Sequence, residues 1–173
     1  GQGYNLVTTL HLADAFAAFA NGGTLWRPYL VKKIESTDGK IYKEFFPVKK
    51  GELKLSAKTI EILNGALRGV VNDPGGTGAN AKLPGIEVCG KTGTSQVMGL
   101  PADEKARRRK ILGAFQKDHA LFACYAPSKA PEIAVAVILE NAGGGGAVAA
   151  PVARKILSAY FEGKKKNKRS SAV

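Results

Sequence analysis

Residues 90–95 read Gly-Lys-Thr-Gly-Thr-Ser, a segment that combines a lysine with three hydroxyl side chains and two glycines. In a strand, alternation would place the hydroxyls of Thr92 and Thr94 on one face, where they can bind a carboxylate. Gly93 leaves room for a substrate backbone to approach. The Thr94 N–H can donate to an oxyanion, a role worth roughly 3 kcal/mol in other acyl-transfer sites, and Lys91 supplies positive potential. The candidate residues are therefore Lys91 and Thr94 for catalysis, and Thr92, Gly93, Thr94 and Ser95 for substrate binding.

Lys-Thr-Gly is one of three signatures of penicillin-binding proteins and related β-lactamases, alongside S-x-x-K and S-x-N. A three-residue match arises often by chance, and a Thr/Gly-rich edge strand with a solvated lysine would have the same sequence. No other pattern indicates a different chemistry. The spacing of His11, His119, Cys89 and Cys124 fits no zinc site. We therefore expect no metal and no cofactor.

The elements around this segment predict an α+β fold. Thr8 or Thr9 can cap a first helix that ends at Asn21-Gly22-Gly23. Ser56 can cap a second helix with the apolar stripe Ile60, Leu63, Leu67 and Val70. Extended segments are predicted at 29–34, 41–46, 86–97, 119–125 and 132–140, and a last helix at about 149–161, closed by Gly163. The first two extended segments form a hairpin around Asp38-Gly39, and the unalternating apolar run at 133–139 predicts a strand buried on both faces.

Charge and hydropathy limit the possible partners. The 173 residues have a formal net charge of +12, but the basic residues cluster at 107–110 and in the polar tail 163–173. Such runs are usually solvated or disordered, and no basic face interleaved with aromatic residues accompanies them. We therefore expect one domain over residues 1–162, a disordered basic tail over 163–173, and no nucleic-acid partner. No apolar stretch approaches the roughly 20 residues that a membrane helix needs.

Blocks along nearly the whole chain resemble the transpeptidase domain of class B penicillin-binding proteins, most closely the elongation-type group known as penicillin-binding protein 2. Gly1-Gln2-Gly3-Tyr4 with Thr8, Leu10, Leu12 and Ala13 is similar to the family's GQG-Y-x-x-T-P-x-Q-L-A stretch. The later blocks follow in the family's order: Asn21-Gly22-Gly23, Arg27-Pro28, Val70-Val71-Asn72, Gly76-Thr77, Lys91-Thr92-Gly93-Thr94, Asp118-His119-Ala120-x-Phe122, Tyr125-Ala126-Pro127 and Ile138-Leu139-Glu140-Asn141.

The resemblance implies a D,D-transpeptidase that cross-links peptidoglycan stem peptides through a serine acyl-enzyme and that β-lactams acylate. It implies the C-terminal portion of the β-lactamase-like serine transpeptidase fold, with helices, three antiparallel strands of the central sheet and the C-terminal helix. The Lys-Thr-Gly strand would be an edge strand, and residues 133–139 would pair with a strand from an upstream part. It also implies glycan-polymerising and elongation-complex partners, a membrane contact only through an N-terminal anchor upstream, and a location on the outer, periplasmic face of the cytoplasmic membrane.

The sequence departs from the family's pattern in one respect. No serine is followed three residues later by lysine, and no S-x-N occurs. Because nucleophilic catalysis needs an activated group with a base in reach, we expect the nucleophile upstream of Gly1 and expect these residues alone to be inactive. Two alternatives stay open: a D,D-carboxypeptidase or β-lactamase-like hydrolase on the same fold, and a non-catalytic binding module. A division-type transpeptidase is a near neighbour of the leading hypothesis.

Overall fold

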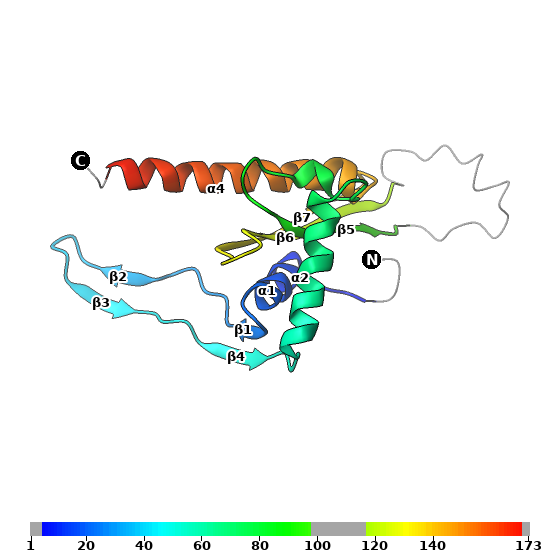
Figure 1. Ribbon diagram of the computed structural model, residues 1–173. Helices are drawn as coiled ribbons and strands as arrows, with labels where there is room; N and C mark the ends of the chain where they lie inside the picture. The colour runs from blue at the N-terminus through cyan, green and yellow to red at the C-terminus, as the bar shows by residue number, and fades with distance from the viewer. Residues whose placement is uncertain (1–4, 98–116, 171–173) are drawn as a thin grey trace, which may run out of the picture.

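Three antiparallel strands form the centre of the fold, and helices lie on both of their faces (Figure 1). The computed structural model describes residues 5–97 and 117–170. Its elements, in order, are α1 (Thr9–Ala20), β1 (Thr24–Trp26), β2 (Lys33–Glu35), β3 (Ile41–Glu44), β4 (Lys49–Glu52), α2 (Ala57–Asn72), the short helix η1 (Ala79–Ala81), β5 (Cys89–Ser95), β6 (His119–Ala126), β7 (Ile133–Leu139), the π-helical turn η3 (Gly145–Ala149) and α4 (Ala150–Ser170). The α+β class and the meander of three strands are as predicted.

The central sheet has the order β5-β6-β7, so β5 and β7 are its edge strands among the described residues. Residues of β5 pair with β6 from Cys89 opposite Tyr125 to Ser95 opposite His119. The first of the three strands starts later than the predicted residue 86. The reason is a tight turn, in which Ile86 bridges back to Leu83 and Gly85 takes a left-handed φ of 71°. The partner strand expected beside residues 133–139 stays a prediction.

Alternation along β6 divides the core into two layers. Phe122 and Cys124 face a cluster that includes Val71 of α2 and Leu157 of α4. Tyr125 and Ala123 face the other way, into a cluster that includes Phe16 of α1. Residues of β7 contribute to both clusters, which confirms the prediction that this run is covered on both faces. Its end is less enclosed, since Ile138 is 39% exposed.

The two predicted helix caps are present. The Thr8 side-chain oxygen accepts a hydrogen bond from the His11 N–H at 3.1 Å, and the Ser56 oxygen accepts one from the Thr59 N–H at 3.1 Å. Each satisfies a donor that the first turn of a helix leaves without a partner, typically worth about 1 kcal/mol. The apolar stripe of α2 is half-buried, and full burial is reached at Val71.

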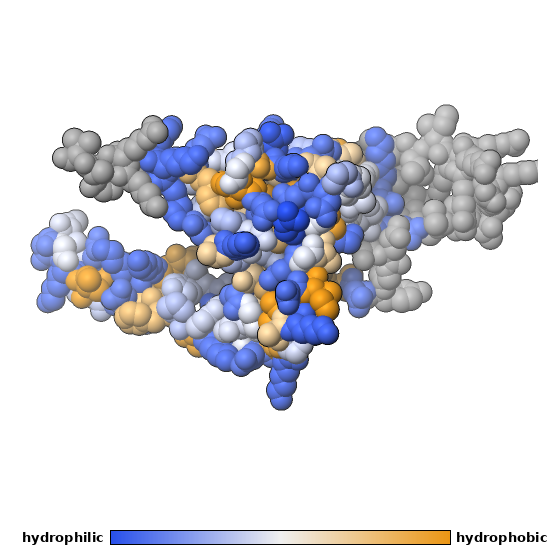
Figure 2. Space-filling model, in the orientation of Figure 1, coloured by the Kyte–Doolittle hydropathy of each residue, from blue (hydrophilic) through white to orange (hydrophobic). Residues whose placement is uncertain are grey.

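An exposed two-stranded ribbon extends away from the helices and the central sheet (Figure 1). Strands β2 and β3 pair antiparallel around the predicted Asp38-Gly39 turn, where Gly39 has a φ of 83°. Apolar side chains such as Ile34 and Ile41 remain exposed on it, and Figure 2 shows an apolar patch there among hydrophilic residues. The pairing of β1 with β4 was not predicted, because segments of three and four residues show no usable alternation.

Helix α4 continues to Ser170, so the prediction that it ends at Gly163 is wrong. The disordered basic tail expected over 163–173 stays a prediction. A glycine inside a helix costs only about 1 kcal/mol relative to alanine, and contacts beyond it compensate. The Lys164 ammonium pairs with the Glu132 carboxylate before β7 and lies 5.9 Å from the centre of the Tyr160 ring. The proposed domain end at residue 162 stays a prediction.

A glycine-rich turn before α4 lies directly against β5 and β6. A Cβ on Gly145 would be 2.1 Å from the Leu121 carbonyl oxygen and 2.5 Å from the Gly93 carbonyl oxygen. Gly144, the preceding residue, has open space around it and a φ of −82°. The turn therefore fits under the strands only where the side chain is absent.

We predict that Gly145→Ala lowers the free energy of unfolding by about 1–3 kcal/mol, the usual cost of overpacking a tight contact. Gly144→Ala, one residue away, should change it by less than about 0.5 kcal/mol. Urea unfolding of the 173-residue chain, followed by circular dichroism, compares the two. Equal effects of both substitutions would contradict the close approach.

Candidate functional site

Strand β5 presents its candidate residues to both faces of the sheet. Thr92 and Thr94 pair with Phe122 and Ala120, so they share the face that packs toward η3 and α4. Lys91 and Ser95 fall on the opposite face, toward α1. Because β5 is an edge strand, its outer side has no strand partner among the described residues. The prediction that Thr92 and Thr94 share a face agrees with this register.

A hollow of about 310 Å³ opens beside β5 on the side of α1. Four candidate residues contribute to its wall, namely Lys91, Thr92, Gly93 and Ser95. Its other walls are mostly apolar and come from the segment before α1, from α1, from β6 and from β7, with Leu6, Val7, Leu12, Phe16, Leu121, Ala123 and Ile138 as the apolar members. Leu6 and Val7 are 97% and 67% exposed, so no described residue covers these two members of the apolar wall.

The candidate side chains differ in their surroundings. Lys91 is exposed, and its ammonium donates a hydrogen bond to the Thr92 carbonyl oxygen at 2.9 Å. Thr94 is half-buried and does not contribute to the wall of the hollow. The structure therefore places Lys91, Thr92, Gly93 and Ser95 around one space. The side chains of Thr92 and Thr94 both belong to the far face of the strand.

Thr77 is a neighbour of the candidate site that the sequence analysis did not single out. Its hydroxyl oxygen lies 3.2 Å from the Thr92 hydroxyl oxygen. It stands in the loop between α2 and η1, where Asn80 donates to the Gly146 carbonyl oxygen at 2.9 Å. The Gly76-Thr77 block was part of the family resemblance, but sequence position alone did not reveal a contact across 15 residues.

Polar contacts connect α2 to the residues that lead into β5. The Arg68 guanidinium hydrogen-bonds the Glu87 carboxylate at 2.7 Å. The Asn72 amide donates to the Val88 carbonyl oxygen at 2.8 Å. The hydrogen bond from Arg68 holds the pKa of Glu87 below its usual value of 4.5. These contacts determine where β5 begins relative to the helix that packs against it.

The two cysteines are structural. Cys89 and Cys124 are both free and fully buried, and they lie in separate core clusters on the two faces of the sheet. Burial raises the pKa of the Cys124 thiol to about 12, so it stays protonated at neutral pH. Tyr125 donates to the Asn64 side chain beside Cys89, and burial raises its pKa too. Cys124 is therefore not a reactive thiolate.

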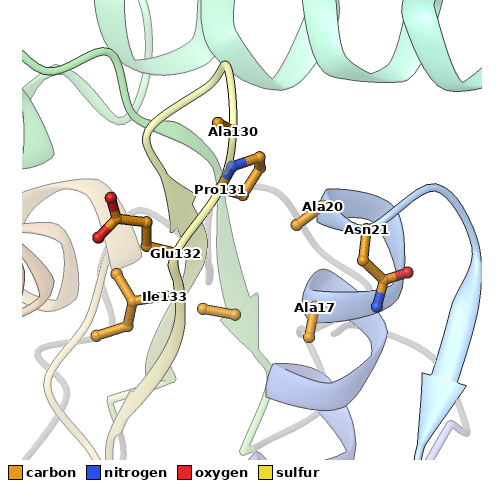
Figure 3. Close-up of a pocket in the computed structure, with 8 residues that line it drawn as sticks. Ala17, Ala20, Asn21, Ala130, Pro131, Glu132 and Ile133 are labelled. Atoms are coloured by element: carbon orange, nitrogen blue, oxygen red, sulfur yellow. The ribbon is translucent and has the colours of Figure 1, made fainter.

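A second hollow, of about 410 Å³, lies between the end of α1 and the start of β7 (Figure 3). Ala17, Ala20 and Pro131 line it, and the Glu132 side chain points away from α1 toward its partner Lys164. No nucleophile or basic side chain lines this space. In the described part of the chain, moreover, no group of three or more His, Cys, Asp or Glu could hold a metal ion. The hollow beside β5 is therefore the better candidate site.

Comparison with known proteins identifies the family and the fold. The family described as the penicillin binding protein transpeptidase domain matches residues 1–158. The chain belongs to this family. Peptidoglycan D,D-transpeptidase MrdA of Haemophilus influenzae is 37% identical over 167 residues, which are 93% of this chain and 25% of that protein. Stage V sporulation protein D of Bacillus subtilis is 36% identical over 91% of this chain and 23% of its own length.

Solved structures of penicillin-binding proteins have the same fold. Penicillin-binding protein A of Mycobacterium tuberculosis, solved as an imipenem acyl-enzyme complex, matches with a TM-score of 0.73 and 28% identity, over 93% of this chain and 32% of that one. PBP2 of Pseudomonas aeruginosa matches with a TM-score of 0.68 and 33% identity, over 92% and 31%. The family and the fold class are as the sequence analysis predicted, and the match to PBP2 agrees with the predicted resemblance to penicillin-binding protein 2. The chain spans about a quarter of the length of MrdA.

We predict a pH dependence for the Arg68–Glu87 ion pair. Because the folded-state pKa of Glu87 is lowered, its stabilising effect is complete above about pH 4.5 and is lost as the pH falls through that lowered value. Glu87→Gln should therefore shift the urea midpoint of the chain downward at pH 7 and shift it less at pH 3. Glu61→Gln, at an exposed position of α2, the helix that carries Arg68, is the control and should shift the midpoint little at either pH. An effect of Glu87→Gln that is equal at both pH values would contradict the ionic origin.

Proposed function

We propose that this chain supplies the Lys91–Thr94 side of the acyl-transfer site of a peptidoglycan D,D-transpeptidase. The observation that supports it most is the position of Lys-Thr-Gly-Thr on β5, an edge strand of the sheet among the described residues, in a chain of the transpeptidase family. Lys91 contributes positive potential, Thr92 and Thr94 bind the ligand carboxylate, and the Thr94 N–H stabilises the oxyanion. Gly93 gives the substrate backbone access, and Ser95 borders the same hollow.

The nucleophile of the proposed reaction is a serine outside these 173 residues, since the sequence contains no S-x-x-K. That serine attacks the carbonyl carbon of a stem peptide, the peptide C–N bond breaks, and the leaving amine takes up a proton. The amine of a second stem peptide then attacks the ester, which releases the serine and forms the cross-link. The exposed apolar wall beside Lys91 is where the segment with that serine would pack. A β-lactam acylates the same serine when its four-membered ring opens, which also gives a serine ester.

Membership of this family also supports a proposal for the cellular location and the partner proteins of the enzyme. We place the domain on the outer, periplasmic face of the cytoplasmic membrane, anchored through residues outside this sequence. None of the described helices is long and apolar enough to cross a membrane. The partners proposed are glycan-polymerising and elongation-complex proteins. The similarity to MrdA, named a D,D-transpeptidase, favours cross-linking over the alternatives of a hydrolase and a non-catalytic module.

Intact mass after exposure to benzylpenicillin tests the proposal. Ring opening expels no atoms, so acylation adds the mass of one whole inhibitor molecule. We expect an adduct on the natural protein extended upstream and none on the 173-residue chain. An adduct on this chain would reveal a nucleophile within it, and Ser95→Ala would then identify or exclude Ser95. Absence of an adduct on both would favour the non-catalytic module.

A substitution of Lys91 tests the role of its charge in the extended protein. Lys91→Met should lower the second-order rate constant of acylation by roughly 100-fold, the scale found when one preorganised electrostatic group is removed from such a site. Lys58→Met, on an exposed position of α2, is the matched control and should leave the rate unchanged. Stopped-flow measurement with a chromogenic cephalosporin gives both values. Equal rates for the Lys91 variant and the unsubstituted protein would contradict the proposed role.

A further inference from the structure

The hydroxyl groups of Thr77 and Thr92 lie 3.2 Å apart, within hydrogen-bonding distance. Thr92 belongs to β5, whereas Thr77 belongs to the loop between α2 and η1. Thr77 is exposed, so its side chain fills no part of the core. The Thr77 hydroxyl therefore lies beside a candidate residue of the site without a packing role.

The backbone on both sides of Thr77 is held tightly. A Cβ on Gly76 would lie 2.3 Å from the Val70 carbonyl oxygen at the end of α2, and one on Gly78 would lie 2.9 Å from the Phe122 ring. The Gly78 N–H donates to the Val70 carbonyl oxygen at 2.9 Å. The two glycines therefore press the loop against α2 on one side and against the sheet on the other, and Thr77 has little freedom to move.

A third contact fixes the loop from the direction of α4. The Thr77 carbonyl oxygen lies against Gly146, where a Cβ would approach it to 2.3 Å, and Asn80 donates to the Gly146 carbonyl oxygen. A Cβ on Gly146 would also lie 3.4 Å from the Thr92 methyl group. Loop, turn and strand thus meet around Thr92, and the orientation of its side chain depends on all three.

The direction of the hydroxyl hydrogen bond decides what Thr92 can do. A threonine hydroxyl has one proton to donate and two lone pairs to accept with. If Thr92 donated its proton to Thr77, it would have none left for a ligand carboxylate. If Thr77 donates to Thr92, the Thr92 proton is free, and the first hydrogen bond strengthens the second by polarisation.

We propose that Thr77 is a positioning residue of the β5 site, whose hydroxyl donates to Thr92 and directs the Thr92 proton toward the carboxylate of the bound stem peptide or β-lactam. The juxtaposition of the two hydroxyls beside the free edge of β5 supports this inference, which rests on the function proposed above. The ligand class is one that presents a carboxylate to the strand edge. Thr77 acts through Thr92 and does not touch the reacting atoms.

The test measures acylation of the extended protein by benzylpenicillin and by its methyl ester, which lacks the negative charge. Thr77→Val should lower the second-order acylation rate constant with benzylpenicillin by about tenfold, the scale of a hydrogen bond that serves a charged group. With the methyl ester the loss should be less than about threefold, because a neutral ester gains less from the polarised donor. Thr77→Ser, which keeps the hydroxyl, should stay within about twofold of the unsubstituted rate with both compounds.

Thr92→Val provides a second, independent measurement. In that background Thr77→Val should have no further effect on the rate with benzylpenicillin, because the group that Thr77 orients is gone. Equal losses with the acid and the ester, or additive losses in the double variant, would overturn the positioning role, and so would a Thr77→Ser variant as slow as Thr77→Val. If the unsubstituted extended protein does not react at all, the proposed function fails and this inference fails with it.

Discussion

The absence of a side chain at Gly145 allows three distant parts of the chain to meet. A Cβ there would overlap both the Leu121 and the Gly93 carbonyl oxygens, at 2.1 and 2.5 Å. With hydrogen in its place, the turn before α4 reaches the backbone of β5 at the middle of the Lys-Thr-Gly-Thr segment. At the neighbouring Gly146, a Cβ would in the same way overlap the Thr77 carbonyl oxygen, so this close contact also requires glycine. The register of the site therefore depends on contacts between backbones, which only glycine permits.

The two-sided core explains why β5 can be both rigid and accessible. Packing through β6 holds the strand, because Phe122 and Cys124 are buried on one face and Tyr125 and Ala123 on the other. No strand pairs with the outer side of β5 among the described residues, so its stability comes from one neighbour and from the helices. A strand supported in this way keeps one edge free for a ligand without losing its place in the sheet.

Helix caps and turns could be predicted from the sequence, whereas contacts between residues far apart in the chain could not. The caps at Thr8 and Ser56 and the Asp38-Gly39 turn follow from residue types within a few positions, and all are present. Helix α4 passes Gly163, and directly after it Lys164 pairs with Glu132, 32 residues earlier in the chain. Thr77 contacts Thr92 only after α2 and the sheet have packed. The Lys-Thr-Gly-Thr motif indicates which strand carries the candidate site. Which residues contact each side chain of that strand depends on tertiary packing.

The alternation of β5 restricts how any ligand can use the whole Lys-Thr-Gly-Thr segment. Lys91 and Ser95 belong to one face of the sheet, and Thr92 and Thr94 belong to the other. A ligand on either face would contact the side chains of only half of these groups. Only a ligand that lies along the free edge can reach both sets and also the backbone N–H groups between them. For this reason a substrate peptide extended beside β5 is the geometry that gives every residue of the motif a role.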